Sequence, residues 1–327
     1  MDPSEMLHSL FTRSYELETD EEDEIIEEGV ERYPSSDADG NEQFYLIDEE
    51  DRDILMHRDA HFGGSFDLML EAYRDGEKSA VVDTSCRRIE ALQKQEVGLQ
   101  NNLAALLLTG RDAEKVAMSR KMYRDLGSLF DEETEEKTLQ KAIASLILSE
   151  AEDPVDEIAH VAEFGQEAIQ PLIELMQSEL FQDPLFPGYG LAPSYAARAL
   201  GELKSEKAIE PLIQFFENNP DAEEAAIQAL ISIGKPAQEL LMRKAAHGNE
   251  EALIALLAFA NADCALFCFD ELKKHTHSPI AHLLALGCEL LPEEKRKEFA
   301  ALEQDPRFSK ETKEEIHFLV TIWNKHL

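Results

Sequence analysis

The chain has 327 residues, of which 43% are hydrophobic and only 7% aromatic, and its 31 Lys and Arg side chains stand against 68 Asp and Glu, a net charge of -37. This length suits two domains or one elongated array rather than a single compact core, and the composition is typical of helices packed through Ala, Leu and Ile. The charge argues against nucleic acid as a partner, because a phosphate backbone repels so acidic a chain.

Targeting and membrane segments are not evident. The start, "MDPSEMLHSLFTR", lacks an apolar signal region, and the longest apolar stretch, Ala252 to Ala260, is about half the length that spans a bilayer. The four cysteines do not look like a disulfide framework. We therefore expect no membrane insertion and a cytoplasmic location, although secretion without a cleaved signal would leave the same sequence.

The first region, residues 1–83, is acidic and mixed. Residues 1–60 hold 21 acidic and 4 basic side chains, a local balance of -17, so we expect this region to be solvated and partly disordered. Within it, the aromatic and β-branched "QFYLI" suits a short strand that pairs with "VERY" as a β-hairpin.

The stretch from Asp37 to Asp48, "DADGNEQFYLID", begins like an EF-hand calcium loop. Asp37, Asp39 and Asn41 stand at the first three ligand positions, but Glu42 occupies the place of the turn glycine and the twelfth ligand is the shorter aspartate. These departures favour an acidic turn between two strands. We predict no metal site here and leave weak calcium binding open.

Residues 84–152 are predicted to be helical and to pack on the region that follows. Three segments have the apolar spacing of helices: "CRRIEALQKQEVGLQNNLAALLL", which ends before Gly110, then "DAEKVAMSRKMYRDLGSLF" and "EKTLQKAIASLILS". Short acidic or glycine-containing turns between them predict an antiparallel arrangement.

Helix starts recur from residue 153 onward. Asp153-Pro154, Ser278-Pro279 and Asp305-Pro306 each put a capping side chain before a proline, which suits the first helical position. Asp221 with Glu224 forms a similar capping box. The chain is therefore divided into short helices.

These helices repeat in pairs. One apolar helix position recurs at spacings of 39, 30, 26 and 30 residues, at Val161, Leu200, Leu230, Leu256 and Leu286. Two short helices thus form one unit.

One decapeptide is nearly duplicated, as "AIQPLIELMQ" from Ala168 and "AIEPLIQFFE" from Ala208. Each copy has an apolar stripe that its own unit cannot cover, so units must stack. Pro171 and Pro211 predict either a late helix start or a shared distortion. The stripes consist of Ile169, Leu172, Ile173 and Met176, and of Ile209, Leu212, Ile213 and Phe216.

The segment "YAARALGELKSEKAIEPLIQFF" resembles the HEAT-like repeats, in the bacterial form also seen in phycobilisome lyases. The resemblance covers about residues 154–291 and is strongest to Lys244; the N-terminal part is not recognised. It implies an all-α fold, an α-solenoid of helical hairpins over residues 153–327 with a concave face that binds a protein partner. The last helix, "KETKEEIHFLVTIWNKHL", looks like a terminal cap, with Trp323 in its core.

Catalytic motifs are absent from the sequence. It has no GxxxxGK[ST], GxSxG or GxGxxG, and it lacks the His-Glu dipeptides by which the HEAT-repeat deoxyhypusine hydroxylases hold iron. Repeat-built glycosylases use a basic groove that so acidic a chain does not offer. The sequence therefore favours a non-enzymatic protein, with no catalytic residue and no cofactor, but does not decide the point.

Soft metal ligands gather in one short region, yet their spacing matches no closed zinc set. We favour small buried cysteines with histidines in or beside a loop, and predict no metal. The residues concerned are Cys264, Cys268, His275, His277, His282 and Cys288.

An aromatic insertion, "FQDPLFPGYGLAPSY", lengthens one repeat. Its prolines and glycines exclude a helix, and insertions on a solenoid often line the binding face. A partner contact and a plug between repeats explain the composition equally well. The candidate partner-binding residues are Phe181, Leu185, Phe186, Tyr189 and Tyr195.

Two functions remain. The first is a protein-binding scaffold or adaptor, whose acidic N-terminal segment would suit a basic partner. The alternative is a lyase-like or chaperone-like protein that holds a small molecule in the concave groove, and only the fold suggests it. The sequence leaves the partner and the oligomeric state open.

Overall fold

A computed structural model describes residues 31–36, 42–74, 84–130, 137–149, 151, 153–219 and 223–325. It is all-α, a helical-repeat solenoid, apart from one short hairpin. The chain divides into two compact units. The N-terminal unit comprises residues 1–161 and 178–193, and the repeat unit comprises residues 162–177 and 194–327.

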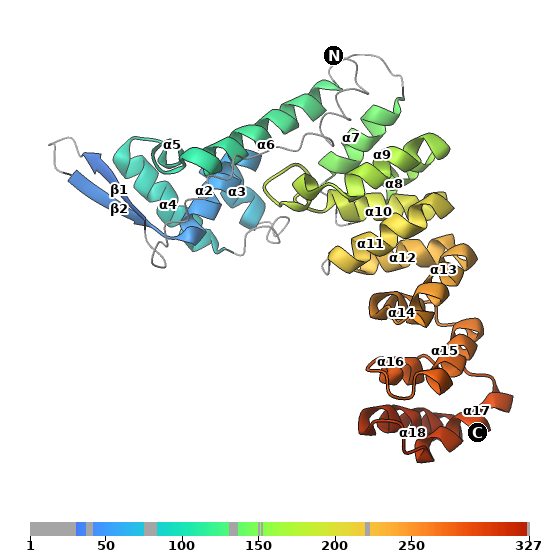
Figure 1. The fold of residues 1–327 in the computed structure, drawn as a ribbon. Coiled ribbons are helices and arrows are strands. Elements are labelled where there is room, and N and C mark those ends of the chain that lie inside the picture. The colour runs from blue at the N-terminus through green and yellow to red at the C-terminus, as the bar shows by residue number, and fades with distance from the viewer. Residues whose placement is uncertain are drawn as a thin grey trace. The chain divides into compact units, whose positions relative to one another are not determined.

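In the N-terminal unit, helices α2, α4, α5 and α6 surround a common core, with α3 against α4 and α7 against α6 (Figure 1). The elements are β1 (Glu31–Ser36), β2 (Glu42–Ile47), α2 (Glu49–His61), α3 (Phe66–Arg74), α4 (Cys86–Leu99), α5 (Leu103–Leu107), α6 (Gly110–Ser128), α7 (Leu139–Leu148), most of α8 (Val155–Ala162) and the 3-10 turn η1 (Glu179–Gln182).

Helices α2 and α3 were not predicted from the sequence. In α2, seven consecutive residues from Ile54 to Ala60 are buried, so the C-terminal half of the helix is enclosed on all sides. Three of the seven are polar, which removes the apolar stripe by which a helix is recognised. The predicted disorder of residues 1–30, 37–41 and 75–83 lies outside the described residues.

Strands β1 and β2 pair antiparallel, with Tyr33 opposite Tyr45. The stretch that resembles a calcium loop, Asp37 to Asp48, therefore follows a strand rather than a helix, and β2 occupies its second half. Its first ligand positions lie outside the described residues. Asp48, its twelfth position, caps α2 by accepting from the Asp51 amide at 2.9 Å, and it forms an ion pair with Arg88. The Asp51 amide and Arg88 lower the pKa of Asp48, so this carboxylate already has its partners.

The first predicted helix of the 84–152 region is two helices. Gln100 adopts φ 54°, in the left-handed region, and ends α4. Asn102 then caps α5 by accepting from the Ala105 amide at 3.0 Å. The apolar periodicity continues across this break, which is why the pattern alone did not show it.

The repeat unit is built from stacked helices (Figure 1). Its elements are α9 (Gln166–Met176), most of α10 (Ala192–Leu203), the 3-10 turn η2 (Glu206–Ala208), α11 (Ile209–Asn218), α12 (Glu223–Ile233), α13 (Lys235–Ala246), α14 (Glu250–Leu257), α15 (Ala262–Lys274), α16 (Ala281–Leu286), α17 (Glu293–Ala301), the 3-10 turn η4 (Leu302–Gln304) and α18 (Lys310–Lys325). Successive helices are in contact from α11 to α14, α15 contacts α16, and α17 contacts α18.

The duplicated stripe is confirmed, because all eight of its side chains are buried in α9 and α11. The repeating apolar position is confirmed at Val161, Leu200, Leu230 and Leu256, all fully buried, but it is wrong at Leu286, which is 42% exposed. The short helix α16 buries Ala281, Leu284 and Ala285 instead of Leu286. The repeating pattern assumes a full-length helix at this place.

The prolines of the two copies, Pro171 and Pro211, lie in helices that start differently. Pro211 is in the first turn of α11, after the 3-10 turn η2, so this helix starts late. Pro171 lies inside α9, where its missing N–H leaves the carbonyl of Glu167 without its helical donor. The two copies therefore do not share one distortion.

The three predicted helix starts at a proline have different outcomes. Helix α8 begins at Val155, directly after Pro154, whereas α16 begins at Ala281, two residues after Pro279, and α18 begins only at Lys310. Asp305 accepts from the Arg307 amide at 3.0 Å in the turn before α18. Ser309 is its cap and accepts from the Thr312 amide at 3.1 Å. The predicted helix start at Asp305 was wrong, and the box at Asp221 lies outside the described residues.

Trp323 packs in the core of the repeat unit, as predicted. Its ring meets Phe299 edge-on at 5.3 Å, its indole N–H donates to the Glu289 carbonyl at 3.0 Å, and Arg296 lies over the ring. These contacts satisfy both the apolar body and the polar edge of the indole.

The apolar stretch from Ala252 to Ala260 comprises most of α14 and the turn that follows. Four of its side chains are buried within the repeat unit. None of the helices in the described ranges combines the length and the apolar character that crossing a bilayer requires.

Glycine at position 201 allows two helices to touch through their backbones. A Cβ built on Gly201 of α10 would lie 2.7 Å from the Ala229 Cα and 3.0 Å from its Cβ in α12. These distances are shorter than van der Waals contact, so no larger residue fits unless the helices separate. Gly201, in the segment "ALGEL", is therefore required for the close packing of α10 on α12.

Gly201→Ala should destabilise the repeat unit by about 1–2 kcal/mol, because overpacking outweighs the gain in helix propensity. Hydrogen exchange of α10 and α12 amides would measure the change. The control, Gly98→Ala in α4, has nothing within 4 Å of the new methyl group and should leave protection of α4 equal or higher. Equal effects of the two substitutions would contradict the close approach.

Candidate functional sites

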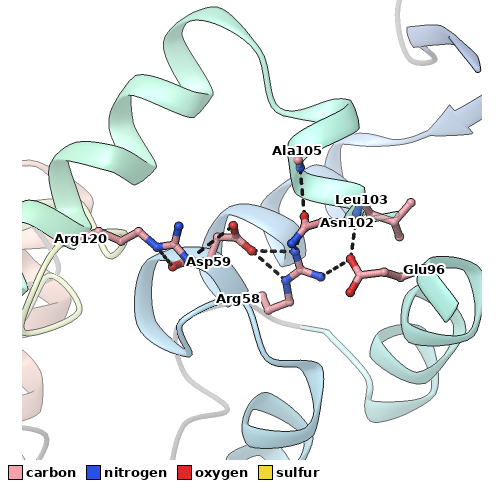
Figure 2. A network of polar contacts seen from close by, with 7 residues as sticks. All are labelled: Arg58, Asp59, Glu96, Asn102, Leu103, Ala105 and Arg120. Carbon is pink, nitrogen blue, oxygen red and sulfur yellow. Dashed lines mark hydrogen bonds and ion pairs between the residues drawn. The ribbon is translucent and has the colours of Figure 1, made fainter. Parts of the chain in front are cut away.

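A fully buried arginine organises the N-terminal unit. Arg58, on α2, has no exposed surface. Its Nε and Nη2 donate to Asp59 Oδ1 at 2.9 and 2.7 Å, and its Nη1 donates to Glu96 Oε2 at 2.7 Å (Figure 2). Its guanidinium also lies 4.3 Å from the centre of the Phe66 ring. A buried guanidinium needs several partners, because its removal from water costs several kcal/mol and only hydrogen bonds and ion pairs offset that cost.

The break between α4 and α5 supplies the remaining contacts. Asn102 Oδ1 accepts from Arg58 Nη2 at 3.2 Å while it caps α5. Glu96 Oε2 accepts from the Leu103 amide at 2.8 Å in addition to Arg58. The two side chains therefore connect the interruption of the helix to the buried cation (Figure 2).

Asp59 joins this network to helix α6. Its carboxylate binds Arg58, and its backbone carbonyl accepts from Arg120 Nε at 2.7 Å. Arg120 Nη2 also lies 3.8 Å from Asp59 Oδ2. Arg120 is 43% exposed, so the network leads from a buried centre to the surface.

A cleft of about 1010 Å³ opens beside Arg120. The end of α2, the Gly63-Gly64 turn, α5 and α6 form its walls, all within the N-terminal unit. Both glycines have positive φ, 59° and 84°, a backbone that other residues rarely adopt. The lining is mainly small, and its charged or hydrogen-bonding side chains are Asp59, His61, Asn102, Arg120, Tyr123 and Arg124.

The aromatic insertion is largely buried. Phe181, Leu185 and Phe186 have exposed fractions of 0, 9 and 2% and belong to the N-terminal unit, whereas Tyr195 has 3% and belongs to the repeat unit. Only Tyr189, of the five candidate residues, is partly exposed. Direct contact of these side chains with a partner stays a prediction, and their burial is typical of a plug.

Polar contacts hold the insertion to α2 and α6. Ser119 donates to the Leu185 carbonyl at 2.7 Å, and Lys115 pairs with Asp183 at 3.1 Å. His61 Nε2 lies 3.0 Å from the Pro184 carbonyl, so this nitrogen carries the proton, and Nδ1 accepts from the Tyr123 hydroxyl at 2.7 Å. The loop is thus part of the N-terminal unit's own core.

Stacking and a close backbone approach complete the attachment. The Tyr189 ring stacks on His61 with centroids 4.2 Å apart. A Cβ on Gly188 would lie 2.5 Å from the Ile147 carbonyl oxygen, and its φ is 84°. Only glycine fits there.

The repeat unit carries a groove of about 620 Å³ between α11 and α13. Its lining mixes charged and apolar side chains, and Lys244 bridges the two helices through Glu210 at 2.7 Å. Its lining residues include Glu206, Ile209, Glu210, Lys235, Glu239 and Arg243.

The cysteines and the histidines of this region differ in their surroundings. Cys264, Cys268 and Cys288 are buried, and burial raises the pKa of Cys264 to about 11 and that of Cys268 to about 12. His275 Nε2 lies 3.3 Å from Glu271, and His282 Nδ1 contacts the Pro279 carbonyl at 2.7 Å. Among the described residues, no three His, Cys, Asp or Glu side chains could hold a metal ion together.

Residues 193–218 match the family model of the PBS lyase HEAT-like repeat. They comprise nearly all of α10, the turn η2 and α11, which is one helical pair. The repeat unit therefore contains a HEAT-like repeat, and its class is that of helical-repeat proteins. No match to the chain was found among curated proteins or among solved structures.

Arg58→Met should destabilise the N-terminal unit by about 3–5 kcal/mol, because it leaves Asp59 and Glu96 without their cation. Arg58→Lys should cost less, since it keeps the charge but loses the fork of donors. The measurement is hydrogen exchange of α2 and α6 amides. Arg74→Met, which breaks the exposed pair with Glu90, should change protection by less than about 0.5 kcal/mol.

Alkylation of the native protein should distinguish the cysteines. Near pH 8, iodoacetamide should modify partly exposed Cys86 much faster than Cys264 or Cys268, whose raised pKa values leave little thiolate. Mass spectrometry of the labelled peptides gives the rates, with unfolded protein as the control for full labelling. Equal rates at Cys86 and Cys268 in the native protein would contradict their burial.

Proposed function

We propose that this chain is a non-enzymatic protein-binding scaffold whose repeat unit holds a partner with a basic, extended segment. The observation that carries the proposal is the groove between α11, which lies in the segment that matches the HEAT-like family, and α13 of the next repeat. Neighbouring repeats there present side chains to solvent from two helices at once.

The lining of the groove carries more acidic than basic side chains. Glu206, Glu210 and Glu239 line it and are exposed, against the cations Lys235 and Arg243. Lys235 and Lys244 already form ion pairs with Glu239 and Glu210, so a basic peptide would compete for these two carboxylates and find Glu206 available. The apolar Ile209 and Leu240 of the lining can cover the methylene stems of Lys and Arg side chains. The net charge of -37 would also speed the approach of a basic partner.

The compartment is part of the proposal. The four cysteines are free, and three of them are buried thiols with raised pKa values. Free thiols are the usual state in a reducing cytoplasm, so we place the partner there as well.

The test begins with a photo-cross-linking residue at Leu240, which would capture the partner in native cells. With the purified partner, the double change Glu206→Lys and Glu239→Lys should weaken binding about tenfold or more, as measured by calorimetry, because two attractive contacts become repulsive. The matched control is Glu311→Lys with Glu314→Lys on the exposed side of α18, which makes the same change in net charge.

The control pair should alter the affinity by less than about twofold if the groove is the site. Equal weakening by both pairs would show that net charge alone drives binding and would contradict the groove. A tightly held small molecule that blocks the Leu240 cross-link would favour the ligand-holding alternative instead.

A further inference from the structure

The cleft of the N-terminal unit has a cationic wall in a strongly acidic chain. Arg120 and Arg124, one helical turn apart on α6, both line it. Residues four apart share one face of a helix. The two guanidinium groups are therefore able to act on one bound group.

The acidic side chain of the cleft cancels only part of this charge. Asp59 is 11% exposed; its Oδ1 is engaged by the buried Arg58, and its Oδ2 forms a longer ion pair with Arg120 at 3.8 Å. Glu96, the other carboxylate of the network, also binds Arg58 and is not part of the lining. Within the described residues, no carboxylate lies within the ion-pair distance of 4.0 Å from Arg124, which is exposed. The uncompensated charge at the cleft is positive.

Arg120 is held in place before any ligand arrives. Its Nε donates to the Asp59 carbonyl at 2.7 Å, and Asp59 is itself fixed by Arg58 (Figure 2). A donor whose orientation is set by a second residue loses less entropy on binding. The buried network therefore positions one cation at the edge of the cleft.

The size and lining suit a small molecule. A volume of about 1010 Å³ lies at the upper end of the range for small-molecule sites. Small side chains leave this space open, and Tyr123, Leu108 and Val116 add an apolar surface. The small residues include Ala60, Gly63, Gly64, Ala104, Ala105 and Ala117.

We infer that this cleft binds a small organic anion, whose carboxylate or phosphate group is held by Arg120 and Arg124 and whose apolar body lies near Tyr123. Arginine forms paired, charge-assisted hydrogen bonds with both groups. The site is separate from the groove of the repeat unit and does not depend on the proposed scaffold function.

Calorimetry of the full chain tests the site with four probes of similar size: phenyl phosphate, benzoate, the neutral benzamide and the cationic benzylamine. At least one anion should bind with a Kd of about 1 mM or lower, and neither of the other two probes should bind measurably. The tighter anion identifies the preferred group.

Arg124→Gln should weaken the binding of that anion about tenfold, because it removes a charged donor. Arg111→Gln is the control, since it makes the same change in charge on the same helix but does not line the cleft. Ala117→Glu should also abolish binding, because the new carboxylate would pair with the two arginines. This variant should keep α6 intact, since a Glu three residues before Arg120 stabilises a helix.

Thermal unfolding of each variant shows that it is folded. The inference is overturned if neither anion binds at about ten times the expected Kd, or if Arg111→Gln weakens binding as much as Arg124→Gln. Binding of benzamide as strong as that of benzoate would equally overturn it, because it would show an apolar site without an anion requirement.

Discussion

Each helix pair of the repeat unit has an apolar face that it cannot bury alone, and burial of that face against the next pair is the interaction on which the solenoid depends. The eight stripe residues of α9 and α11 are buried for this reason. Gly201 shows how closely the pairs approach, since even one methyl group there would meet the backbone of Ala229. The groove between α11 and α13 follows from the same stacking, because its two walls come from successive repeats.

The N-terminal unit depends on a different constraint. Its centre holds a guanidinium rather than an apolar side chain, so its helices must bring polar groups to one point. Asp59 comes from α2, Glu96 from the end of α4 and Asn102 from the cap of α5. A single continuous helix over residues 86–107 could not place both Glu96 and Asn102 at Arg58, because they are six positions apart and lie on different faces of a helix. The break is therefore part of the polar core.

The repeats could be predicted from the sequence, whereas the cleft could not. Repetition shows in a single sequence because stacked units need the same apolar spacing, as at Leu200 and Leu230. Arg58 offered no such signal, since a charged residue in an acidic segment is normally solvated, and its burial depends on residues about forty positions away. The insertion is non-helical only between the 3-10 turn η1 and α10, because Ala192 to Tyr195 belong to α10. Composition could not tell a plug from a contact surface, because both use Phe, Tyr and Pro.

Net charge acts on the two candidate sites with opposite sign. A chain at -37 attracts a basic partner from a distance but repels a free anion, and salt reduces both effects beyond about 8–10 Å. The cleft must therefore hold its anion through contacts shorter than this length, with Arg120 and Arg124, which salt screens less. Salt should weaken binding at the repeat groove, where long-range attraction helps. At the cleft, salt screens the repulsion between the anion and the acidic chain as well as the attraction to Arg120 and Arg124. Binding at the cleft should therefore depend less on ionic strength than binding at the repeat groove.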